Sequence, residues 1–119
     1  MGDLGQNIIL RADGNGKIGY GHLSRLNALS NIIGQEYKSI FLTRHDSSVS
    51  VIADNIEIVI IPIEISLDNE PDWIYKNFDP QSNCIVADGY QFSSSYQKKM
   101  KELGYKLMFI DDLVKFHMH

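Results

Sequence analysis

The chain has 119 residues, of which 44% are hydrophobic and 22% charged, a composition typical of one globular domain. The formal net charge of −4 argues against nucleic acid as the main partner, because phosphate backbones are bound largely through lysine and arginine. Cys84 is the only cysteine, so an intramolecular disulfide is impossible and a reducing compartment is expected. No apolar stretch approaches the ~20 residues of a membrane span, and the first residues do not resemble a signal peptide. We therefore expect a cytoplasmic protein with no membrane partner.

Short apolar runs alternate with segments of helical periodicity along the chain. Apolar residues three and four positions apart indicate a helix over 22–33, and Gly34 supplies a stop signal. Pro71 suits the first turn of a helix over 71–78, and serines at 93–95 precede a helix that Gly104 ends. A short helix through Asn55 is expected after the second strand. The predicted strands cover 7–10, 38–43, 57–62, 83–88 and 105–110.

This alternation predicts an α/β fold, namely a three-layer, Rossmann-like parallel sheet with helices on both faces. Right-handed crossovers bring the carboxyl ends of all strands to one edge, where open sheets of this kind bind ligands. Asp13, Asp88 and Asp111 each follow a strand directly, so we expect all three at that edge. No repeat or linker interrupts the pattern, and residues 1–119 are expected to form a single domain.

A glycine-rich segment over 14–21 lies between the first strand and the first helix. Residues 14–19 match the dinucleotide pattern G-x-G-x-x-G by letter, but no acidic residue closes the second strand, as ribose binding requires. A Walker loop fits less well, because Ile18 stands where Ser or Thr must reach the metal. A flexible crossover without a ligand is one interpretation. Close approach of a ligand to the backbone explains so many glycines better.

His22 opens the first helix, where the positive end of the helix dipole favours a neutral ring, as a general base requires. A capping or packing role for His22 is the alternative. Arg25, one turn later, is either solvated or bound to Asp13 or a ligand oxyanion.

Three motifs carry a resemblance to a known family. Arg-Ala-Asp at 11–13 with Ile-Gly-Tyr-Gly-His at 18–22 resembles the signature that opens the UDP-sugar hydrolases of pseudaminic acid biosynthesis and the related spore-coat polysaccharide proteins. Val-Ala-Asp-Gly-Tyr at 86–90 resembles the family's strand ending in D-x-Y, and Ile-Asp-Asp at 110–112 resembles its I-D-D strand. The resemblance spans about residues 7–112 and implies the N-terminal domain of a two-domain GT-B glycosyltransferase-like fold.

The resemblance also implies roles for individual residues. His22 matches the catalytic histidine, which activates water for attack at the anomeric carbon and releases UDP, and Tyr90 matches an active-site tyrosine near the sugar. Neither a cofactor nor a metal ion is implied. The implied substrate-binding residues are Arg11, Asp13, Gly19, Tyr20, Gly21, Arg25, Asp88, Asp111 and Asp112.

Proteins of that family have a C-terminal domain that holds most of the UDP, and we expect this chain to lack it. The resemblance therefore implies the sugar-side half of an enzyme that cleaves UDP from a UDP-diacetamido-trideoxyhexose, inactive or weakly active alone. The implied partners are the UDP-activated amino sugar and either a separately encoded C-terminal half or a second copy of the chain. Two alternatives stay open: half of a GT-B glycosyltransferase for surface polysaccharides, and a non-catalytic sugar-binding or assembly module.

Overall fold

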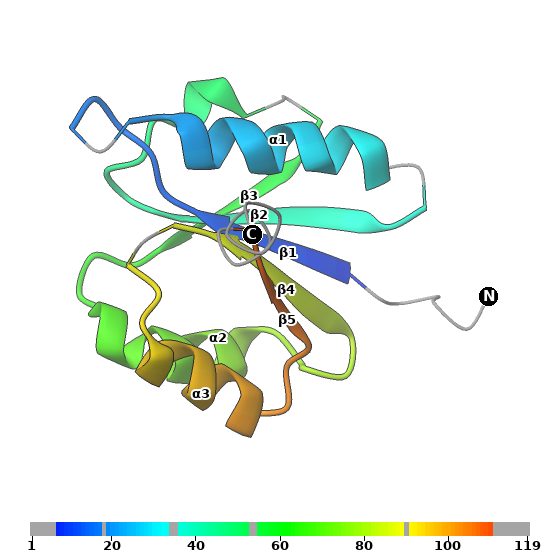
Figure 1. The fold of residues 1–119 in the computed structure, drawn as a ribbon, viewed down its shortest axis with the longest axis vertical. Helices are drawn as coiled ribbons and strands as arrows, with labels where there is room; N and C mark the ends of the chain where they lie inside the picture. The colour runs from blue at the N-terminus through cyan, green and yellow to red at the C-terminus, as the bar shows by residue number, and fades with distance from the viewer. Residues whose placement is uncertain (1–6, 18, 34–35, 53–54, 90, 111–119) are drawn as a thin grey trace, which may run out of the picture.

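The computed structural model describes residues 7–17, 19–33, 36–52, 55–89 and 91–110. In these residues five strands form one parallel sheet in the order β3-β2-β1-β4-β5 (Figure 1). This arrangement confirms the predicted Rossmann-like α/β class. The elements are β1 (Asn7–Ala12), α1 (Gly21–Ile33), β2 (Lys38–Arg44), the 3-10 turn η1 (Val49–Val51), β3 (Glu57–Ile61), the 3-10 turn η2 (Leu67–Asn69), α2 (Glu70–Asn77), β4 (Asn83–Asp88), α3 (Ser94–Glu102) and β5 (Leu107–Phe109).

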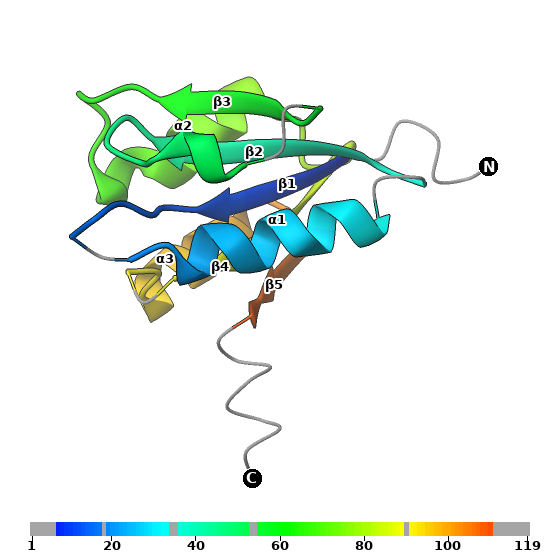
Figure 2. The same cartoon turned by 90° about the horizontal axis from the view of Figure 1, so that it is seen from above.

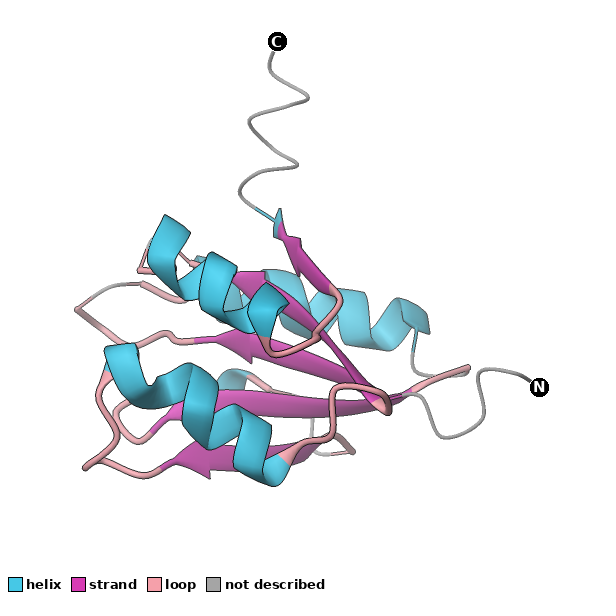
Figure 3. Ribbon diagram, turned by 90° about the horizontal axis from the view of Figure 1, so that it is seen from below, coloured by secondary structure: helices cyan, strands magenta, loops and turns pink. Residues whose placement is uncertain are grey.

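Helices cover both faces of the sheet. Helix α1 lies across one face, over β1 and β4 (Figure 2), and α2 and α3 cover the other face (Figure 3). The sheet is apolar on both sides because successive strand residues point to opposite faces. Ile9 on β1 packs toward α2 and α3, whereas its neighbour Leu10 packs toward Leu23 and Leu26 of α1. All four side chains are completely buried, and each contributes ~1.5–3 kcal/mol through its removal from water.

Most of the predicted helix signals are confirmed. The Ser93 hydroxyl accepts a hydrogen bond from the Tyr96 amide at 3.2 Å and caps α3, and Gly104 follows that helix with a φ of +100°. Pro71 lies in the first turn of α2. Helix α1 ends at Ile33 as predicted, and Gly34 lies outside the described residues.

Two predicted elements differ from the structure. Where a helix is expected between β2 and β3, the described residues form only the single turn η1, and Ser48 makes no side-chain capping bond there. The neighbouring Ser47 hydroxyl is held by Thr43 at 2.7 Å, so it does not cap a helix either. Strand β5 is shorter than predicted, because Tyr105 donates its amide hydrogen to the Met100 carbonyl and closes the end of α3 instead of entering the sheet.

The carboxyl edge of the sheet is arranged as expected. Ala12 pairs in register with Asp88, the last residue of β4, and Asp13 is the first residue beyond β1. The prediction that both aspartates share this edge is therefore confirmed, whereas Asp111 lies outside the described residues. None of the helices in the described ranges is long and apolar enough to cross a membrane.

Candidate functional site

At the carboxyl edge, the side chains of His22, Asp88 and Arg25 meet. Helix α1 begins at Gly21, so His22 lies in its first turn, and β4 ends at Asp88 directly beneath it. His22 Nδ1 lies 2.6 Å from Asp88 Oδ1. Arg25 is one helical turn further and donates from Nε to Oδ2 at 2.7 Å and from an Nη atom to Oδ1 at 2.8 Å. The two α1 residues thus share one carboxylate from the sheet.

The Asp88 carboxylate fixes the tautomer of the neutral His22 ring. An ionised carboxylate can only accept hydrogen bonds, so at 2.6 Å Nδ1 must carry the hydrogen. The lone pair of the ring then lies on Nε2, which can take a proton from a bound hydroxyl group or water. In many hydrolases a carboxylate orients the histidine that acts as the general base in this same way.

Burial differs strongly among these three side chains. The Asp88 side chain is completely buried, that of His22 is 13% exposed, and that of Arg25 is 47% exposed. The bidentate contact with Arg25 places a permanent positive charge against the buried carboxylate. Arg25 therefore pairs with Asp88 and not with Asp13, while about half of its side chain remains exposed to solvent. An Nη atom of Arg25 also lies 3.0 Å from His22 Nδ1.

A second group of charged residues is centred on Arg11 and includes Asp13 and Glu70. Arg11 is completely buried at the end of β1, and its guanidinium stacks 5.2 Å from the centre of the Phe92 ring. It donates to Glu70 from Nε at 2.7 Å and from an Nη atom at 2.9 Å, and it makes two further bonds to Asp13 at 2.8 and 3.1 Å. Burial alone disfavours the charged guanidinium, but the Glu70 and Asp13 carboxylates outweigh this effect and raise the pKa of Arg11.

Asp13 is an acceptor for donors from several segments. Its Oδ1 atom accepts from Arg11, from the Thr43 hydroxyl at 3.0 Å and from the Arg44 amide at 2.8 Å. Its Oδ2 atom accepts from Arg11 and from Gln91 at 3.1 Å. Burial alone would raise the pKa of Asp13, but the Arg11 charge and these hydrogen bonds lower it. Asp13 thus joins the ends of β1 and β2 to the segment that follows β4.

Glu70 connects the same group to the helices on the other face. It is completely buried at the start of α2, where a carboxylate also benefits from the helix dipole. Besides Arg11, it accepts hydrogen bonds from Arg44 at 3.1 Å and from the Tyr96 hydroxyl of α3. Burial, followed by the negative charge of Glu70, raises the pKa of Tyr96, so its hydroxyl keeps its proton.

Sequence reasoning did not single out Glu70, Arg44 or Gln91. The position of Arg44 at the end of β2 is a signal of the kind used for Asp13 and Asp88, since it places the residue at the carboxyl edge. Glu70 comes directly before Pro71 at the start of a predicted helix. Acidic residues are common at this position because of the helix dipole, so the position does not indicate an ion pair. Its partner Arg11 is 59 residues away in the sequence.

The glycine-rich segment forms a small closed turn. Asn15 and Gly19 exchange two backbone hydrogen bonds, of 3.2 and 2.7 Å, and Gly19 has a φ of +88°. The amide groups of these two residues are thereby occupied, which disfavours a phosphate cradle at this point. A Cβ atom on Gly14 would lie 2.7 Å from Leu23 Cδ1, so Gly14 is required for packing. Gly21 is different, because a Cβ atom there would meet no atom of the described residues within 4 Å.

The remaining predicted residues divide into three groups. Tyr20 is 43% exposed and Gly21 is exposed as well, so both can be reached by a ligand. Arg11 and Asp13 are buried at the end of β1, and their predicted contact with substrate stays a prediction. Predicted residues that lie outside the described ranges are Tyr90, Asp111 and Asp112.

No group of three or more His, Cys, Asp or Glu side chains that could hold a metal ion occurs within the described ranges. The sequence matches no model of a known protein family, and a comparison with curated proteins also gives no match.

Proposed function

We propose that this domain is the sugar-side half of a nucleotide-sugar hydrolase with a GT-B arrangement, and that His22 is its general base. The observation that carries the proposal is the 2.6 Å contact of His22 Nδ1 with Asp88, at the edge of the sheet where such folds bind ligands. The resemblance of the segments over 11–25, 86–90 and 110–112 to the UDP-sugar hydrolases of pseudaminic acid biosynthesis supports it.

In the proposed reaction, water attacks the anomeric carbon of the sugar. His22 Nε2 takes a proton from that water as the new carbon–oxygen bond forms, and the bond between the anomeric carbon and the phosphate oxygen breaks. UDP leaves with the bonding electrons, and the products are the free sugar and UDP. Asp88 keeps the ring in the required tautomer and stabilises the imidazolium that forms. General-base catalysis of this kind contributes ~10²–10⁴ to a rate.

Two features support a sugar ligand beside His22. Gly21 leaves its Cα open, so the backbone at the start of α1 can approach a substrate closely. Tyr20, the residue before Gly21, is 43% exposed, and aromatic rings supply apolar contact area at a polar site. By this proposal the substrate is a UDP-diacetamido-trideoxyhexose, whose UDP part is held mainly by a second, C-terminal domain on the same or a separate chain.

The test is release of UDP from a UDP-diacetamido-trideoxyhexose, measured with the 119-residue chain alone and with a separately produced C-terminal half of a related hydrolase. We expect turnover in the mixture, and H22A is expected to lower kcat by ~10²–10⁴, since it removes the base. H45A is the matched control, because His45 is exposed and lies outside the site.

Three results would contradict the proposal. Equal turnover by H22A and the unmodified chain would remove His22 from the mechanism. Transfer of the sugar to an acceptor hydroxyl, with no free sugar, would identify a glycosyltransferase that uses the same base. Absence of turnover, together with no change in the amide resonances of residues 19–25 at millimolar substrate, would leave the domain without a sugar site at this edge.

A further inference from the structure

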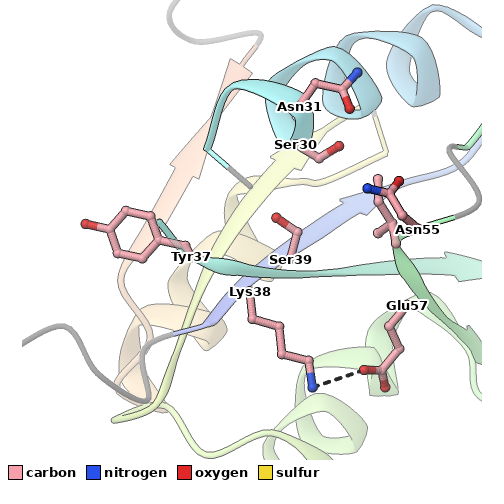
Figure 4. Close-up of a pocket in the computed structure, with 8 residues that line it drawn as sticks. Ser30, Asn31, Tyr37, Lys38, Ser39, Asn55 and Glu57 are labelled. Atoms are coloured by element: carbon pink, nitrogen blue, oxygen red, sulfur yellow. Dashed lines mark ion pairs between the residues drawn. The ribbon is translucent and has the colours of Figure 1, made fainter. Parts of the chain in front are cut away.

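A cavity lies at the opposite, amino edge of the sheet, between α1 and the first residues of β2 and β3 (Figure 4). Its volume is about 490 Å³, within the ~300–1,000 Å³ typical of small-molecule sites. Ser30 and Asn31 line it from α1, Ser39 lines it from β2, and Asn55 lines it from the segment before β3. His22 is eight residues before Ser30 on the same helix, or roughly 12 Å along its axis, so this cavity is separate from the candidate active site.

The short crossover between β2 and β3 leaves this space open. Helix α1 packs over β1 and β4, and the only helical element described between β2 and β3 is the single turn η1. Ser39 and Phe41 alternate with Ile40 along β2, so they point to the same face of the sheet. Phe41 belongs to the core beneath α1 and Ile52, whereas Ser39 lies two residues earlier, at the amino end of β2 and beside the cavity.

The cavity contains a polar atom whose hydrogen bonding is not satisfied. Ser39 Oγ is shielded from water, and no described residue lies within hydrogen-bonding distance of it. Most buried polar groups in proteins have a partner, and an unpaired one is costly. The hydroxyl turns about a single χ1 bond between staggered positions, which allows it to face a bound molecule. The Ser30 hydroxyl donates to the Asn27 carbonyl at 2.6 Å and keeps lone pairs that can accept.

The charges of the cavity indicate what kind of molecule fits. Lys38 and Glu57 line its rim, and their side chains pair with each other at 3.3 Å, so the described lining residues carry no net formal charge. The other polar groups are hydroxyls and carboxamides, which both donate and accept hydrogen bonds. In Figure 4 the Asn55 amide extends toward the space between α1 and β2, whereas Tyr37 points away from it.

We propose that this cavity binds an uncharged molecule of monosaccharide size that is rich in hydroxyl or amide groups. Its hydrogen bonds would come from the carboxamides of Asn31 and Asn55 and from the hydroxyl of Ser39. An anion of the same size would find no unpaired positive charge there. This site goes beyond the proposed hydrolase activity and does not depend on it.

The test is an NMR titration of the ¹⁵N-labelled chain with N-acetylglucosamine, and with gluconate as an anion of similar size. We expect saturable shifts of the amide resonances of residues 30–31, 39 and 55–56 with N-acetylglucosamine and none with gluconate. N55A is expected to weaken binding about fivefold, the equivalent of one hydrogen bond. Asn55 is exposed, so this variant should fold normally.

S39L provides a second test, because its larger side chain replaces the Ser39 hydroxyl and projects toward the cavity, and it should weaken or abolish the shifts. H22A is the control for the other edge, and it should leave the shifts at 30–31 and 55–56 unchanged even if it removes shifts near the first turn of α1. Absence of saturable shifts in these residues, an equal response to gluconate, or full binding by N55A would overturn the proposal, whatever the fate of the hydrolase activity.

Discussion

Replacement of Asp13 by asparagine is the most direct test of the buried charges. The substituted amide has one oxygen, which can still accept from Thr43 and from the Arg44 backbone in place of Oδ1. Its NH₂ group then takes the place of Oδ2, which now accepts a hydrogen bond from an Arg11 Nη atom at 3.1 Å, so two donors face each other. Arg11 also loses one of its two carboxylate partners. Loss of one partner from a buried ion pair costs ~3–5 kcal/mol. For a domain of this size that corresponds to a fall in Tm of roughly 10–20 °C.

The effect of D13N depends on pH in a defined direction. Because folding lowers the pKa of Asp13, its stabilising contribution is complete above the pKa of an unfolded aspartate, ~3.9, and is lost as the pH falls through the lower folded value. The unmodified chain should therefore exceed D13N in unfolding free energy by a constant amount between pH 7 and about 5. The difference should narrow below about pH 4.

Urea denaturation followed by circular dichroism, at pH 7 and at intervals down to pH 3.5, measures both effects. D46N is the matched control, since Asp46 is exposed and makes only a 3.4 Å contact with Asn15, and it should change stability by less than ~0.5 kcal/mol. A D13N effect under 1 kcal/mol at pH 7, or a difference that stays constant down to the lowest pH, would refute this account of the Arg11 and Asp13 pair.

Two further predictions concern stability away from these charges. G14A should lose ~1–3 kcal/mol in urea unfolding because its Cβ would lie 2.7 Å from Leu23 Cδ1, whereas G21A should change stability by less than ~1 kcal/mol; similar losses in both variants would contradict the packing argument. Burial, followed by the charge of Asp79, raises the pKa of Tyr105 to about 12, so stability should fall as the pH rises above ~10, where an unfolded tyrosine ionises. Y105F should reduce this loss of stability at alkaline pH. It should cost ~1 kcal/mol of unfolding free energy at pH 7, because the Tyr105 hydroxyl donates to the Ile74 and Phe78 carbonyls. An unchanged fall in stability at alkaline pH would contradict the role assigned to the Tyr105 hydroxyl.

The sequence was sufficient for the sheet because the strands are apolar on both faces. Strand β4 runs from Asn83 to Asp88 as predicted, since its apolar run is bounded by polar residues at each end. The edge that collects Asp13 and Asp88 followed from parallel topology alone. The crossover after β2 was predicted less well, because neither serine caps a helix there. The Ser47 hydroxyl contacts Thr43, and Ser48 makes no side-chain capping bond.

The sequence predicted which residues belong to the candidate site but not how they contact one another. A position at the start of a helix or the end of a strand identified His22 and Asp88, but their contact joins residues 66 positions apart and depends on how α1 crosses β4. Arg11 illustrates the limit more clearly. An arginine near the end of a strand is usually exposed. Its complete burial rests on Glu70, which approaches only when α2 docks on the opposite face of the sheet.

The contacts of Glu70 have a consequence for how the domain opens. One carboxylate at the start of α2 holds Arg11 of β1, Arg44 of β2 and the Tyr96 hydroxyl of α3. Detachment of α2 would remove Glu70 from the buried Arg11 guanidinium, and detachment of α3 would remove the Tyr96 hydroxyl from the Glu70 carboxylate, so the loss of either helix weakens the contacts that hold the other. We expect α2 and α3 to exchange their amide hydrogens as one cooperative unit, in which neither helix unfolds ahead of the other.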